Sequence, residues 1–167
     1  MTTRIRLVQC HSHNLLLVHV VWATARRAPL LEPSADAWLG QVLRCKASEA
    51  GGLLVACGNA VDHVHVVLRY PSTVTVASVM QRLKGGSSYE WNVSRRSPRL
   101  LWQTGFWAES VSPIHLARGV RYVEMQRAHH GDGVAPESWE AVLFPARDEA
   151  KAEDIAGHDD VEVSARR

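Results

Sequence analysis

The chain of 167 residues has few cysteines and no long apolar run, and both shortages narrow the class of protein. Its three cysteines are odd in number and show no Cys-x-x-Cys spacing, which argues against a disulfide framework and favours reduced thiols in a cytoplasmic protein. No stretch approaches about 18 consecutive apolar residues, so we expect no membrane span. The apolar run 15–22 is interrupted by His19 and lacks a small-residue cleavage site, so it predicts a strand and not a signal peptide.

Acidic residues are scarce in most of the chain and abundant at its end. Residues 1–130 contain 15 Lys and Arg against 7 Asp and Glu, whereas residues 131–167 contain 4 against 10. A basic body suits a partner with a phosphate backbone, although an excess of this size does not by itself establish nucleic-acid binding. We predict an N-terminal extension over 1–13, one folded domain over 14–131, and a partly disordered acidic tail over 132–167.

Strand spacing and helical spacing alternate along the domain. Predicted strands cover residues 14–23, 53–57, the segment that contains His63 and His65, 100–103 and 106–108. Predicted helices cover 34–50, 74–91 and 113–130. This order predicts an α+β fold: a ferredoxin-like antiparallel sheet with helices packed on one face and a C-terminal helix that bears Tyr122.

Two histidines at strand spacing form the first half of a candidate site. Within Asp-His-Val-His-Val-Val-Leu, residues 62–68, the period of a strand places His63 and His65 on one face and Val64, Val66 and Leu68 on the other. Two adjacent imidazoles can chelate a metal ion, and a pair of hydrogen-bonded strand histidines is the alternative.

A tyrosine and a glutamine on the last predicted helix supply the second half. Tyr122 and Gln126 are four residues apart and therefore share a face. Tyr122 offers a nucleophile, and Gln126 would add a neutral oxygen ligand to the two histidines. A mixed nitrogen and oxygen site suits Mg²⁺ or Mn²⁺ acting on phosphate, with Zn²⁺ as an alternative. Taken singly, Tyr122 is more often a core-edge residue and Gln126 a surface residue, so the prediction depends on the joint pattern.

With the Asp-His-Val-His motif of residues 62–65 and the Tyr-Val-Glu-Met-Gln motif of residues 122–126, the sequence resembles the single-tyrosine HUH transposases of small bacterial insertion sequences. The palindrome-associated tyrosine transposase-like proteins are related to them. The resemblance runs from about residue 17 to residue 130 and includes His-Val-Val-Trp at 19–22 and Gln-Arg-Leu-Lys-Gly at 81–85.

The resemblance implies cleavage and rejoining of single-stranded DNA with hairpin or palindromic ends, through a covalent 5′-phosphotyrosine. It assigns Tyr122 as the nucleophile and His63, His65 and Gln126 as ligands of Mg²⁺ or Mn²⁺. It also implies a homodimer in which the tyrosine helix of one subunit serves the histidines of the other. The sequence itself leaves open whether Tyr122 acts in cis or in trans.

Other residues have weaker predicted roles. Tyr70 and Tyr89 are competing nucleophiles that lack the amide four residues on. His19 is predicted to be packed or hydrogen-bonded, and Asp62 to brace a neighbouring imidazole or the turn. Six basic residues are predicted to contact DNA phosphates, with an ordinary solvated position as the alternative for each: Arg26, Arg27, Arg82, Lys84, Arg95 and Arg96. Two rival functions are a domesticated, non-cleaving hairpin DNA-binding protein and a small metal-dependent hydrolase that does not use Tyr122.

Overall fold

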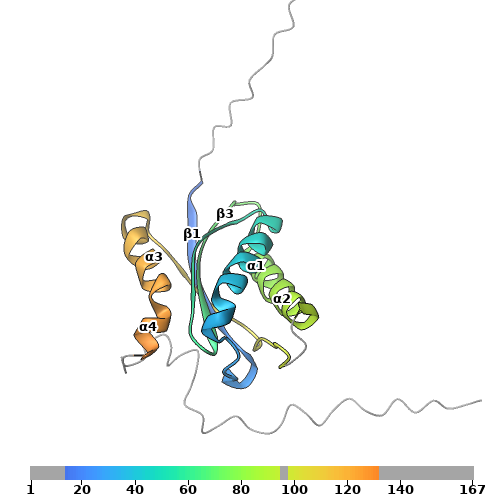
Figure 1. Ribbon diagram of the computed structural model, residues 1–167. Helices are drawn as coiled ribbons and strands as arrows, with labels where there is room; N and C mark the ends of the chain where they lie inside the picture. Colours follow the sequence, from blue (N-terminus) through green and yellow to red (C-terminus); the bar gives the residue numbers. More distant parts are fainter. Residues whose placement is uncertain (1–13, 95–97, 132–167) are drawn as a thin grey trace, which may run out of the picture. The chain divides into compact units, whose positions relative to one another are not determined.

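A four-stranded antiparallel sheet lies at the centre of the residues that the computed structural model describes, 14–94 and 98–131 (Figure 1). Its strands, in the spatial order β2-β3-β1-β4, are β1 (Leu16–Ala23), β2 (Leu53–Asn59), β3 (His63–Tyr70) and β4 (Trp107–Ser110). The predicted extension 1–13, the predicted tail 132–167, and Arg95 and Arg96 lie outside the described residues.

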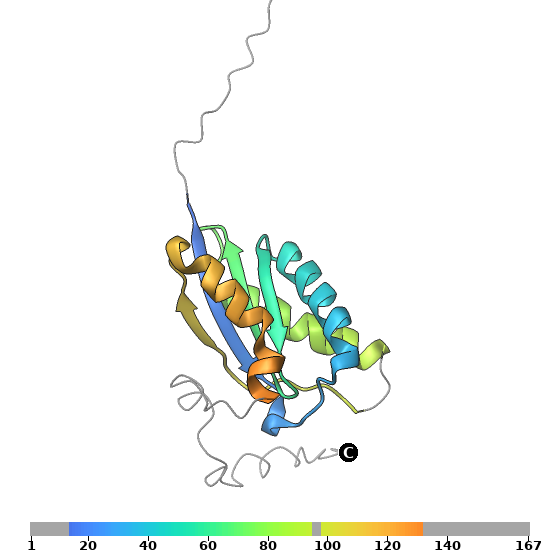
Figure 2. The ribbon, with the colours of Figure 1, turned by 60° about the vertical axis from the view of Figure 1, so that its left-hand side comes forward.

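Helices cover both faces of this sheet. Figures 1 and 2 show α1 (Asp36–Glu49) and α2 (Val76–Ser94) on one face, and α3 (Leu116–Glu124) and α4 (Gln126–Gly131) on the other. Short 3₁₀ turns occur at Ala25–Arg27, Pro33–Ala35 and Pro113–His115. The predicted α+β fold and its element order are therefore confirmed. The helix with Tyr122 lies on the face opposite α1 and α2, a placement that the sequence pattern had not specified.

Strand β3 shows how one sequence serves both layers, because successive side chains point to opposite faces. Val64, Val66 and Leu68 belong to the larger apolar core, which α1 and α2 cover. Val67 belongs to a smaller core that Val123 of α3 covers. Burial of each such side chain stabilises the fold by about 1.5–3 kcal/mol. The aliphatic face of β3 therefore packs under α1 and α2, and its histidine face lies under α3, as the strand period predicts.

The single helix predicted over 113–130 is divided in the structure. Met125 has φ −92° and ψ 6° and separates α3 from α4. Its N–H still donates to the Arg121 carbonyl at 3.1 Å, so the turn is preserved across the break. The strand predicted over 100–103 is reduced to one bridge between Thr24 and Trp102. Two hydrogen bonds flank this bridge, from the Ala25 N–H to the Leu101 carbonyl at 2.8 Å and from the Gln103 N–H to the Ala23 carbonyl at 3.0 Å.

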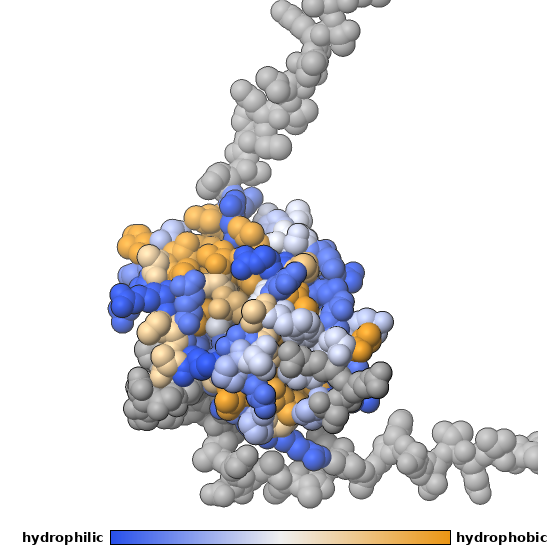
Figure 3. Space-filling model, viewed as in Figure 1, coloured by the Kyte–Doolittle hydropathy of each residue, from blue (hydrophilic) through white to orange (hydrophobic). Residues whose placement is uncertain are grey.

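No helix in the described part of the chain is long and apolar enough to cross a membrane. The face seen in Figure 3 mixes hydrophilic and hydrophobic residues, and the hydrophobic ones gather where α3 begins. Ile114, in the turn before α3, is 88% exposed. The start of the tyrosine helix is therefore its solvent-facing end.

Candidate metal and nucleophile site

The two predicted histidine ligands lie at the start of β3, on the face that α3 covers. His63 and His65 are 1% and 0% exposed, and their ring centroids are 5.1 Å apart. Burying two imidazoles is costly unless their nitrogens find partners. The surrounding side chains therefore decide what the pair can bind.

Asp62 holds the first imidazole. Its Oδ1 atom lies 2.7 Å from Nδ1 of His63, and its Oδ2 atom accepts a hydrogen bond from Nε of Arg27 at 2.7 Å. Burial alone would raise the pKa of the Asp62 carboxyl, but the hydrogen bond with His63 and the charge of Arg27 lower it on balance. An ionised Asp62 can only accept, so His63 carries a proton on Nδ1. The predicted bracing role of Asp62 fits these contacts.

His19 of β1 contacts the second imidazole. Nε2 of His19 lies 3.1 Å from Nδ1 of His65, and the two rings stack with centroids 5.3 Å apart. Burial lowers the pKa of His19 to about 4, so this ring is neutral at pH 7. The His19 ring also makes edge contacts with the rings of Trp107 and Tyr122, at centroid distances of 5.4 and 6.2 Å.

The structure brings Tyr122 to the histidines of its own chain. The Tyr122 ring, on α3, meets the His65 ring edge-on with centroids 6.0 Å apart and an interplanar angle of 72°. The phenol is half-buried, so it remains accessible from solvent. A nucleophile near the end of the folded region and an imidazole pair near its middle therefore lie on one side of the sheet.

Gln126, the first residue of α4, is 1% exposed. Its Nε2 atom donates to the Tyr122 carbonyl at 3.3 Å, and its Oε1 atom is buried with no hydrogen-bond partner among the described residues. A buried amide oxygen without a partner costs about 1–3 kcal/mol unless something binds it.

Among the described residues, no group of three His, Cys, Asp or Glu side chains could hold a metal ion. The candidate donor set is therefore two imidazoles and the Gln126 amide oxygen, and such a neutral nitrogen and oxygen set fits Mg²⁺ or Mn²⁺.

A glycine lets the tyrosine helix approach the sheet. Gly58 of β2 pairs with His65, and a Cβ atom at Gly58 would lie 1.7 Å from the Val123 carbonyl oxygen and 3.6 Å from Cβ of Gln126. Only a residue without a side chain fits there. The contact also places Gln126 over the strand position next to His65.

An ion pair fastens the beginning of α4. The guanidinium of Arg127 donates through Nε to Oδ2 of Asp36 at 2.9 Å and through Nη2 to Oδ1 of Asp36 and to the Leu31 carbonyl. Asn59 of β2 donates to the same Asp36 carboxylate at 3.0 Å. This two-point ion pair between Arg127 and Asp36, the Arg127 fork, joins α4 to the start of α1. It holds Arg127, the residue that follows Gln126, in place.

The predicted DNA contacts are spread over two regions. Arg26 and Arg27 follow β1 in the left-handed backbone region, with φ 57° and 54°, and Arg27 is paired with Asp62 beside the histidines. Arg82 and Lys84 lie on α2, across the sheet from Tyr122. The Lys84 ammonium donates to the Gln103 and Gly105 carbonyls at 2.7 and 2.6 Å, so it holds the loop before β4. Phosphate contacts by these four residues stay predictions.

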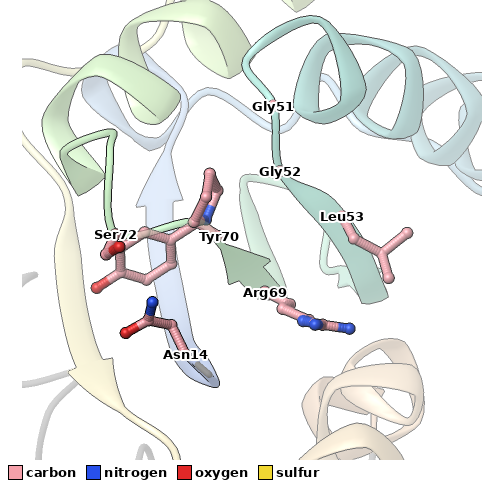
Figure 4. Close-up of a pocket in the computed structure, with 8 residues that line it drawn as sticks. Asn14, Gly51, Gly52, Leu53, Arg69, Tyr70 and Ser72 are labelled. Atoms are coloured by element: carbon pink, nitrogen blue, oxygen red, sulfur yellow. The ribbon is translucent and has the colours of Figure 1, made fainter. Parts of the chain in front are cut away.

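A pocket of about 450 Å³ lies at the far end of the sheet from the histidines (Figure 4). Tyr70, which lines it, pairs with the first residue of β1, whereas His63 pairs with the last. The other lining residues are Asn14, Gly51, Gly52, Leu53, Arg69, Pro71 and Ser72. The candidate site is therefore separate from this pocket.

The fold is similar to the folds of two solved structures. It superimposes on a crystal structure assigned as a transposase from Deinococcus radiodurans R1, with a TM-score of 0.57, 24% identity, and coverage of 75% of this chain and 98% of the other. It also superimposes on a REP-associated tyrosine transposase bound to a REP hairpin, with a TM-score of 0.56, 14% identity, and coverage of 81% and 76%. At these identities the likeness concerns the fold.

The sequence gives the family. Residues 12–126 match the family described as IS200-like transposases, so the chain belongs to that family. A comparison with curated protein sequences finds no match. The resemblance inferred from the histidine and tyrosine motifs is confirmed, and family membership supports a DNA strand-transfer enzyme.

Proposed function

We propose that this chain cleaves and rejoins single-stranded DNA through a covalent 5′-phosphotyrosine on Tyr122. The observation that carries the proposal is the position of the Tyr122 ring, 6.0 Å from the His65 ring in the same subunit. The phenol loses its proton and its oxygen attacks the scissile phosphorus, while the bond to the 3′ oxygen breaks and that oxygen takes up a proton. A 3′-hydroxyl from another strand reverses the reaction, so one phosphodiester is exchanged for another without a nucleotide cofactor.

His63, His65 and Gln126 would hold a divalent cation, Mg²⁺ or Mn²⁺, beside the phenol. The buried Oε1 atom of Gln126 supports this assignment, because it is an oxygen donor that has no hydrogen-bond partner in the described part of the chain. When bound, such a cation would polarise the scissile phosphate and neutralise the charge that develops on it. Asp62 and Arg27 would keep His63 in place during the reaction.

The DNA partner is proposed to carry a hairpin or palindromic end, as the REP hairpin of the similar structure does. Arg26 lies just before the Arg27–Asp62 pair beside the histidines, and we propose it as a phosphate contact. We also propose a homodimer located in the cytoplasm, on the family resemblance alone.

The experiment mixes purified protein and Mg²⁺ or Mn²⁺ with labelled hairpin-bearing single strands taken from the DNA that flanks the gene. We expect a covalent protein–DNA band on a denaturing gel, lost in Tyr122→Phe and retained in Tyr89→Phe, whose parent ring is 67% exposed on α2. An undiminished band in Tyr122→Phe would refute the nucleophile. Retarded migration of the DNA on a native gel without any covalent band would instead favour the non-cleaving hairpin-binding protein. DNA turnover that is unchanged in Tyr122→Phe would favour the metal-dependent hydrolase.

A further inference from the structure

A third imidazole, that of His19 on β1, touches the proposed ligand pair. β1 and β3 pair so that Val21 faces His65 and His19 faces Val67. His19 and His65 are therefore diagonal neighbours on one face of the sheet. The 3.1 Å separation of His19 Nε2 and His65 Nδ1 is a hydrogen bond, in which one ring donates and the other accepts.

This hydrogen bond decides which nitrogen of His65 can be a ligand. Because Nδ1 is engaged with His19, a metal ion can be bound only through Nε2. A neutral imidazole with its lone pair on Nε2 carries its proton on Nδ1. In a binding-competent site, His65 is therefore the donor and His19 Nε2 the acceptor.

The opposite direction of this bond has a different consequence. If His19 carried its proton on Nε2 and donated to His65, the His65 proton would lie on Nε2 and the ring could not bind a cation through that atom. The direction of one hydrogen bond thus separates a competent site from an incompetent one.

We propose that His19 is a positioning residue that holds His65 in the tautomer protonated on Nδ1, an inference that rests on the proposed function. Asp62 does the same for His63, since its carboxylate accepts from Nδ1 at 2.7 Å. The two imidazoles then both present Nε2, one braced by a carboxylate and the other by a neighbouring strand's imidazole. Loss of such an outer partner typically weakens metal binding by about 10–100-fold.

The test measures the tautomers directly, by ¹⁵N NMR of the histidine side chains in metal-free protein. His19→Phe keeps an aromatic ring against Trp107 and Tyr122 and removes the acceptor. His19→Gln offers an amide oxygen at about the reach of Nε2. Asp62→Ala is the matched control, because it removes the acceptor of His63 and leaves the acceptor of His65 in place. Calorimetric titration with Mn²⁺ gives the affinity of each variant, and thermal unfolding shows that each is folded.

We expect wild-type His65 to be protonated on Nδ1 and His19→Phe to shift it toward the Nε2-protonated form, with Mn²⁺ affinity lower by about 10–100-fold. His19→Gln should restore both, and Asp62→Ala should change the tautomer of His63 and not that of His65. A wild-type His65 protonated on Nε2, or an unchanged tautomer in folded His19→Phe, would overturn the proposal. Wild-type protein that binds no Mn²⁺ and forms no DNA adduct would reject the proposed function, whereas the NMR result would still decide the role of His19.

Discussion

Gly58→Ala is the substitution that separates the approach of the tyrosine helix from the chemistry of its side chains. A Cβ atom there would lie 1.7 Å from the Val123 carbonyl oxygen and 2.8 Å from its carbonyl carbon. Both atoms belong to backbone and cannot rotate away. Since Cβ contacts under 3.0 Å essentially never occur, α3 must retreat from β2 by about 1.3 Å or more.

This displacement predicts a large loss of rate with a modest loss of stability. A misplacement of about 1 Å between reacting groups can cost about 100-fold, or roughly 2.7 kcal/mol of activation free energy. Overpacking of this kind lowers the free energy of unfolding by about 1–3 kcal/mol, against a typical total of about 5–15 kcal/mol. We therefore expect Gly58→Ala to remain folded and to form the Tyr122 adduct about 100-fold more slowly.

The assay is the initial rate of adduct formation on hairpin DNA, measured beside thermal unfolding of the same samples. Gly85→Ala, in the interior of α2, is the control, because a Cβ atom there meets nothing within 4 Å. It should keep the wild-type rate and gain about 0.5–1 kcal/mol in helix stability. A folded Gly58→Ala protein with a rate equal to that of Gly85→Ala would refute the reasoning.

Two further predictions concern the groups around the site. Arg127→Met removes the ion pair with Asp36, so thermal unfolding should show a free energy of unfolding lower by about 1 kcal/mol, and adduct formation should be slower. A rate of adduct formation equal to that of wild type would mean that other contacts hold α4. The pKa of Asp62 is lower in the folded chain than its ordinary 3.8, so its contribution to stability is complete above that value and is lost as the pH falls below it. In metal-free buffer, urea unfolding of Asp62→Asn should show a smaller loss of stability below about pH 4 than wild type, and parallel curves would contradict this.

Local spacing predicts much of the site because it needs only the period of one element. The strand period puts His63 and His65 on the face opposite Val64, and the helical period keeps Tyr122 and Gln126 one turn apart even across the break at Met125. The family motifs then connect these two short segments. These are the parts of the site that the sequence alone could supply.

The remaining contacts depend on register and on close approach, which no local pattern encodes. His19 reaches His65 only because β1 and β3 pair with His19 opposite Val67, 48 residues downstream. The Arg127 fork to Asp36 spans 91 residues. Lys84, which is also predicted to bind phosphate, donates to two loop carbonyls, and its charge alone does not reveal these contacts.

The contacts of α3 and α4 bear on whether Tyr122 serves its own histidines. Both helices are fastened at the end where they meet, through Val123 over the sheet and Arg127 on Asp36, whereas Ile114 before α3 is exposed. Moving them off the sheet would expose Val123, at a cost of about 1.5–3 kcal/mol, and break the ion pair. In a dimer, α3 and α4 could make the same contacts with the partner's sheet only if the segment between β4 and the turn at Pro113 could reach that sheet. This segment has only two residues, about 7 Å of chain. The short connection therefore favours action in cis.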